Sequence, residues 1–129
     1  MKMLVKGALA LSFLTATSAC ASLITGGDLV REGEPAARFV FENRSDGQAF
    51  DTILISTCDA SSYGLDRLPD GVTVMPGQSY SWDVSAGCYD VMAGNVGDGS
   101  TPGEQINIPA GRTFVLYYDG RGSSTSNVR

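Results

Sequence analysis

The sequence has 129 residues, no histidine, and 14 acidic against 9 basic residues. This length suits a single domain, and the acidic balance disfavours binding to nucleic acids or anionic lipid surfaces, because both carry negative charge. The lack of histidine excludes a histidine-dependent catalytic triad, a histidine metal ligand and an imidazole pH switch.

Residues 1–20 have the pattern of an export signal. Lys2 and Lys6, the only lysines of the chain, precede the short apolar run Ala8 to Leu14, which is followed by small residues. The run is too short to cross a membrane, which takes about 20 apolar residues. We therefore expect export. The chain that follows keeps 7 of the 9 basic residues (9 minus the 2 lysines) against 14 acids, a net charge of −7.

The end of the signal allows two kinds of processing. Ala19-Cys20 resembles a bacterial lipobox, in which Cys20 is lipidated, although Thr17 stands where leucine is usual. The alternative is ordinary cleavage after Ala21, which would discard Cys20. An aspartate directly after the lipidated cysteine resembles an inner-membrane retention signal, and Ala21 stands there instead. A lipoprotein is therefore expected in the outer membrane, facing the periplasm or the surface. Without the lipid, the protein is expected to be periplasmic or secreted.

The next segments predict a tether and then two strands. Residues 21–36 are rich in glycine and show no period, which is typical of a tether between anchor and domain. Alternating residues predict strands at 38–42 and 50–57. Asp46-Gly47 lies in the polar loop between them and indicates a β-hairpin.

The middle of the chain predicts three further strands. Residues 72–74 are short and β-branched. Pro76-Gly77 fits a type II turn, because proline has the required φ and glycine tolerates a positive one. In residues 79–84, Tyr80, Trp82 and Val84 share one face, which predicts a sheet with one wet face. Another strand is expected at 88–92.

Two strands at 105–108 and 113–118 complete the predicted domain, and 119–129 has no apolar pattern and predicts a flexible tail. The fold class predicted for residues 37–118 is all-β, a single antiparallel β-sandwich of about seven strands.

The cysteine count predicts one disulfide. Three cysteines is an odd number, and exported proteins rarely keep a free thiol. Assigning Cys20 to the lipid or to the discarded signal leaves Cys58 and Cys88 as a pair. In the chain-entropy model, closing a loop of roughly 30 residues stabilises the fold by about 3.5 kcal/mol.

The residues favour no catalytic activity. The exported chain has no lysine for Ser–Lys catalysis or a Schiff base, and a disulfide leaves no thiol nucleophile. Asp66 and Asp70 flank Arg67, but nothing in their spacing places two carboxylates across one cleft, as a glycosidase needs. The loop Gly94 to Ser100 has oxygen donors for calcium but lacks the EF-hand pattern. We therefore expect neither catalytic residues nor a metal or other cofactor.

The loop between the two cysteines is the expected place for a ligand contact. Its candidate contact residues are Tyr63, Asp66 and Arg67, since Tyr63 is the aromatic residue most expected to be exposed. Trp82 and the other aromatic residues are expected in the core.

Three motifs resemble a group of small exported bacterial β-sandwich proteins and lipoproteins. They are Tyr63-Gly64-Leu65-Asp66-Arg67-Leu68, Pro76-Gly77-Gln78-Ser79 and Gly87-Cys88-Tyr89-Asp90. Tryptophan is expected where Tyr63 stands. The resemblance covers about a third of the exported chain, and it implies fold and export rather than an activity.

Together these features favour a non-enzymatic protein of the cell envelope, a lipid-anchored binding or assembly module. Its expected partners are the membrane, through the lipid, and an envelope protein or glycan. The alternative is a carbohydrate- or peptide-binding module, and a small carboxylate-dependent hydrolase is a distant third.

Overall fold

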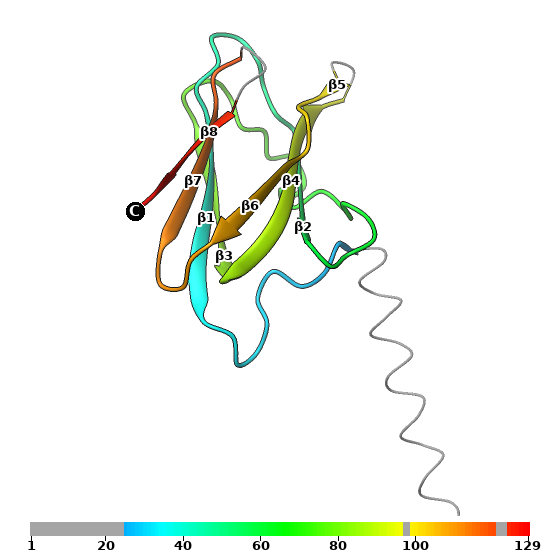
Figure 1. Ribbon diagram of the computed structural model, residues 1–129. Helices are drawn as coiled ribbons and strands as arrows, with labels where there is room; N and C mark the ends of the chain where they lie inside the picture. Colours follow the sequence, from blue (N-terminus) through cyan, green and yellow to red (C-terminus); the bar gives the residue numbers. More distant parts are fainter. Residues whose placement is uncertain (1–24, 97–98, 121–123) are drawn as a thin grey trace, which may run out of the picture.

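The computed structural model describes residues 25–96, 99–120 and 124–129, which form two β-sheets packed face to face (Figure 1). This confirms the predicted all-β sandwich, with eight strands where about seven were expected. No helix in the described part of the chain is long and apolar enough to cross a membrane. The predicted signal, with Cys20, lies outside the described residues.

The first sheet has the strand order β3-β1-β7-β8. Its strands are β1 (Ala36–Asn43), β3 (Ser79–Ser85), β7 (Thr113–Tyr118) and β8 (Ser124–Val128). The pair β1–β3 is antiparallel, but β1 and β7 are parallel, which departs from the antiparallel arrangement that was expected. The turn at residues 109–112 bonds to the start of β1, so β7 begins at the same end of the sheet as β1 and both strands run in one direction.

The second sheet is built around β4 (Gly87–Asn95). It pairs antiparallel with β2 (Thr52–Thr57), with β6 (Glu104–Ile108) and, at its end, with the short β5 (Gly99–Ser100). Strands β1 and β2 therefore lie in different sheets, and the hairpin predicted between them is wrong.

Buried Asn43 explains why the chain leaves the first sheet after β1. Its side-chain nitrogen donates to the carbonyl oxygens of Gln48 and Val74, and its side-chain oxygen accepts from the backbone N–H of Ser45. These bonds hold a loop that carries the chain across to the second sheet. A two-stranded hairpin would instead have kept the chain in the first sheet.

Two other predicted segments differ from the structure, and one turn is confirmed. Within 119–129, residues 124–128 form β8, whose backbone pairs with β7, so this part is not a flexible tail. An edge strand is held by backbone bonds, which need no apolar pattern.

Residues 72–74 form no strand, and Val74 makes an isolated bridge to Phe50. Gly77 has a φ of +83°, as the predicted type II turn requires.

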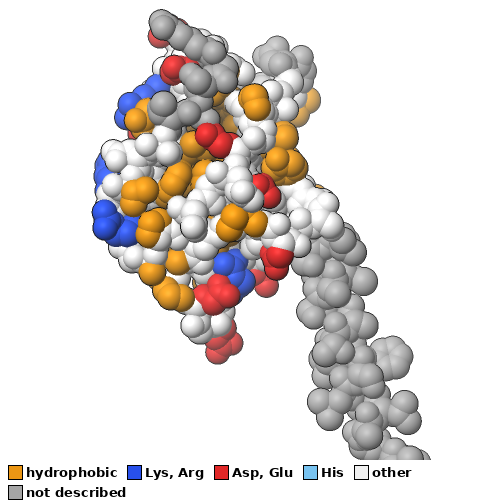
Figure 2. Space-filling model, in the orientation of Figure 1, with side chains coloured by type: hydrophobic (Ala, Val, Ile, Leu, Met, Phe, Trp, Pro, Cys, Tyr) orange, Lys and Arg blue, Asp and Glu red, His pale blue; other side chains and the backbone are white. Residues whose placement is uncertain are grey.

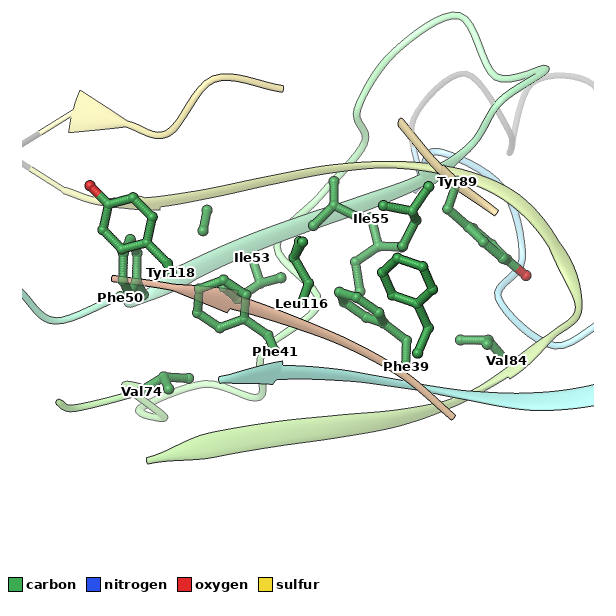
Figure 3. Close-up of a cluster of buried hydrophobic side chains, with 14 of the residues drawn as sticks. Phe39, Phe41, Phe50, Ile53, Ile55, Val74, Val84, Tyr89, Leu116 and Tyr118 are labelled. Carbon is green, nitrogen blue, oxygen red and sulfur yellow. The ribbon is translucent and has the colours of Figure 1, made fainter. Parts of the chain in front are cut away.

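The core lies between the two sheets. Figure 3 shows the labelled side chains of both sheets pointing toward one another, among them Phe39 of β1 and Ile55 of β2. The predicted alternation in β3 is confirmed, since Tyr80, Trp82 and Val84 are partly or fully buried, whereas Ser79, Ser81 and Asp83 are exposed. Trp82 stacks on Phe39, with ring centroids 5.6 Å apart, as expected of a core aromatic residue.

Candidate functional site

Residues 25–35, which we call the strap, lie along the lower end of the sandwich in Figure 1 before the chain enters β1. The backbone N–H of Thr57, at the end of β2, donates to the Gly26 carbonyl oxygen at 2.8 Å. The backbone N–H of Ser85, at the end of β3, donates to the Leu29 carbonyl oxygen at 2.7 Å. The part of the predicted tether that the structure describes is therefore docked on both sheets.

An open groove of about 590 Å³ lies between the strap, the turn after β2 and the turn that connects β3 to β4 across the two sheets. Pockets of this size are the default candidates for binding small ligands. Figure 2 shows acidic side chains gathered at the same end of the molecule, close to a basic one. The charged residues that line the groove are Asp28, Arg31, Glu34 and Asp59.

Arg31 is held by neighbours on three sides. Its Nε pairs with Glu34, its Nη1 donates to the Asp28 carbonyl oxygen at 2.7 Å, and its Nη2 donates to the Tyr89 hydroxyl at 3.2 Å. Burial works to lower the pKa of Arg31, but the hydrogen bonds with Glu34 and Tyr89 outweigh it and raise the pKa. The guanidinium is therefore a permanent charge that fastens the strap to β4.

Asp59 is the exposed carboxylate in the turn after β2. A hydrogen bond from the Thr57 side chain and one from its own backbone lower the pKa of Asp59. The carboxylate is thus ionised at neutral pH and is a hydrogen-bond acceptor rather than a general acid.

The predicted disulfide between Cys58 and Cys88 is confirmed, and it forms part of the groove wall. The two Cα atoms are 5.4 Å apart, and the backbone N–H of Cys58 donates to the Cys88 carbonyl oxygen. The bond therefore ties the end of β2 to the start of β4 within one sheet. Both sulfurs are oxidised, so the groove has no thiol nucleophile.

Asp66, a predicted ligand contact, caps the open edge of β2. One carboxylate oxygen accepts from the backbone N–H of Ile53 at 2.9 Å and from that of Leu68 at 3.0 Å. A strand edge with unpaired backbone N–H groups can pair with a strand of another chain and lead to aggregation. Asp66 satisfies one of these groups and is exposed at the same time.

Arg67, also a predicted ligand contact, joins the strap to β2. Its Nη2 donates to the carbonyl oxygens of Thr25 at 2.7 Å and Gly27 at 2.6 Å, and its Nε donates to that of Ile55 at 3.0 Å. Burial lowers the pKa of Arg67, and the charge of Asp28 opposes this shift. The described contacts of Asp66 and Arg67 are structural, and a ligand role for them stays a prediction.

Tyr63, the third predicted contact, is half-buried, and it does not line the groove. Its hydroxyl lies so close to Gly103 that a Cβ there would overlap it. The structure therefore brings Tyr63, Asp66 and Arg67 together along the strap and β2, beside the groove rather than in it.

The groove residues of the strap were missed by the sequence analysis. Arg31 and Glu34 stand three positions apart in a glycine-rich segment that has no period, so nothing marked them as neighbours of the disulfide. Leu29 was the available signal, as an apolar residue in a polar stretch, and it packs against the core while Val30 stays 64% exposed.

The loop Gly94 to Ser100 includes residues 97–98, which lie outside the described residues. Asn95, one of its candidate oxygen donors, uses its side-chain nitrogen to donate to the Ala49 carbonyl oxygen. No group of three or more Cys, Asp or Glu side chains within the described residues is placed to hold a metal ion.

No protein-family model matches this chain, and no curated protein matches it. Among solved structures, the chain is similar to the C-terminal domain of AlgF from P. aeruginosa, at 15% sequence identity and a TM-score of 0.41. The likeness covers 75% of this chain and 97% of that domain. It is too distant to inform the function.

Proposed function

We propose that this chain is a non-enzymatic protein of the bacterial cell envelope, anchored by a lipid on Cys20 and acting as a binding or assembly module. The pairing of Cys58 with Cys88 carries this proposal. Stable disulfides form in oxidising compartments outside the cytosol. The pairing also leaves Cys20, which follows an export-signal pattern, as the one cysteine of the sequence that is available for another modification.

The chemistry of the groove supports a role without catalysis. Arg31 is engaged by Glu34 and Tyr89, and Asp59 is ionised. A hydrolytic site needs a positioned acid and base or an activated nucleophile. The sequence has no histidine, and its two lysines lie in the predicted signal.

The outer edge of β3 supports assembly with another protein. The backbone N–H of Ser85 points away from β1, toward the strap, and residues alternate along a strand. The backbone groups of Ser81 and Asp83 therefore also face outward, and among the described residues none bonds them from outside β3. Both residues are exposed. An open edge of this kind can pair with an extended segment of a second protein.

Two experiments test the proposal. Feeding cells an alkyne analogue of palmitate should label the wild type and leave Cys20→Ala unlabelled in the soluble fraction. A photo-crosslinking amino acid at position 81 should capture an envelope protein, and the same residue at exposed position 70, in a loop, should not. Absence of the label would refute the anchor, and equal crosslinking at the two positions would refute assembly through β3.

A carbohydrate- or peptide-binding module is the second candidate, because the groove offers carboxylate acceptors beside exposed backbone. Titration with soluble envelope glycans or peptides, followed by NMR, tests it. Shifts at Asp59 and Ala86, which line the groove, would favour this alternative. Their absence, with crosslinking at position 81, favours assembly.

A further inference from the structure

The strap is clamped from the first residue that the structure describes. Arg67 Nη2 bonds the carbonyl oxygens of both Thr25 and Gly27, and the Thr57 backbone N–H bonds that of Gly26. Three consecutive carbonyl groups are thus fixed to the edge and end of β2. The point at which the chain enters the domain is therefore fixed on the sandwich.

The loop that carries Leu65 lies beside this fixed point. A Cβ on Gly64 would overlap the Thr25 carbonyl group, so the two backbones are in direct contact. Leu65 follows Gly64 and is 58% exposed. An exposed leucine is thus next to the entry of the chain.

The length of chain beyond Thr25 limits how far an anchor can be. Four residues, 21–24, separate Cys20 from Thr25, and five residue steps reach at most about 18 Å. The seven-residue strand β3 is itself about 23 Å long. A lipid on Cys20 would therefore hold the Leu65 loop close to the membrane and would leave the end of β1 away from the strap farther out.

Met75 lies away from the strap. It lies in the turn that bonds to Asn43, at the end of β1 away from the strap, and it is 48% exposed. Leu65 is next to the contact with Thr25, whereas Met75 lies at the end of β1 away from the strap. They offer a matched pair of positions for comparing distance from a membrane.

We infer that the Leu65 loop and the start of the strap form a membrane-contacting surface, and that its partner is a bilayer of zwitterionic phospholipid. This inference rests on the proposed lipid anchor. Leu65 is the apolar contact. The carboxylates of Asp28, Asp59 and Asp66 are exposed at this end and disfavour an anionic lipid surface.

The test uses the full chain, exported and acylated in cells and reconstituted into vesicles. An environment-sensitive fluorescent amino acid replaces Leu65 or, as the control, Met75. The vesicles contain phosphatidylethanolamine and phosphatidylcholine with a brominated quenching lipid. We expect the label at 65 to lose most of its fluorescence and the label at 75 to lose little. The single tryptophan, Trp82, reports whether each variant is folded.

Each outcome decides a separate point. Absence of the palmitate label would refute the lipid anchor and this inference with it. Acylated protein with equal quenching at 65 and 75 would overturn the inference and leave the anchor intact. With phosphatidylglycerol in the vesicles, we expect weaker quenching at 65, and unchanged quenching would overturn the preference for zwitterionic lipid.

Discussion

The carbonyl oxygen of Thr25 accepts a hydrogen bond of 2.7 Å from Arg67, which lies 42 positions further along the chain. The backbone of Arg67 is used as well, since the Trp82 indole nitrogen donates to its carbonyl oxygen at 3.1 Å. Arg67 therefore connects the strap, β2 and β3, and closes one side of the sandwich.

Arg67→Lys should destabilise the protein by about 2 kcal/mol, because a lysine cannot present a rigid fork of donors to carbonyl groups on two segments. Urea unfolding followed by Trp82 fluorescence measures this. The matched control is Arg38→Lys. Arg38 makes an exposed ion pair with Asp83, and its replacement should change stability by less than about 0.5 kcal/mol. Equal losses in the two variants would contradict the role assigned to Arg67.

Gly64→Ala and Gly71→Ala separate backbone strain from steric contact. Both glycines have a φ of +79°, so alanine is strained by about 1 kcal/mol at either position. A Cβ at Gly71 meets nothing within 4 Å, whereas one at Gly64 overlaps the Thr25 carbonyl group. We expect Gly64→Ala to be the less stable variant and to show faster hydrogen exchange in residues 25–35. Identical behaviour of the two variants would mean that the strap does not depend on this contact.

Replacing both cysteines of the disulfide with serine should lower the free energy of unfolding by about 3.5 kcal/mol, since the bond closes a loop of 30 positions. Urea unfolding with and without reductant measures the loss. Reductant should destabilise the wild type and leave the Cys58→Ser/Cys88→Ser variant unchanged. If reductant leaves the free energy of unfolding of the wild type unchanged, the predicted stabilisation by the disulfide is wrong.

Asp59 should titrate below the ordinary range of an aspartate, because the Thr57 side chain hydrogen-bonds its ionised form. The pKa in the folded state is below that of the unfolded state, so the stabilisation is present above the unfolded pKa and is lost as the pH falls through the folded one. NMR titration of the carboxyl carbon measures this. In Thr57→Val the pKa of Asp59 should rise toward its ordinary value, and an unchanged pKa would assign the shift to another group.

Local patterns in the chain predicted much of the fold. The alternation of Tyr80, Trp82 and Val84 identified the inner face of β3, and Pro76-Gly77 identified a turn, because strand alternation and turn geometry depend on neighbouring residues. Three cysteines, of which one was assigned to the predicted signal, were enough to predict the Cys58–Cys88 bond.

The strap, the crossing after β1 and the parallel pairing of β1 with β7 follow only from the tertiary structure. Each depends on contacts between distant segments, and their partners are often backbone carbonyl groups, which every residue has. Arg67 illustrates the point: its acceptors are carbonyl oxygens of Thr25, Gly27 and Ile55, and no side-chain type marks them in the sequence. Composition and spacing predict an exported sandwich with one disulfide, and long-range backbone bonding decides that residues 25–35 are docked.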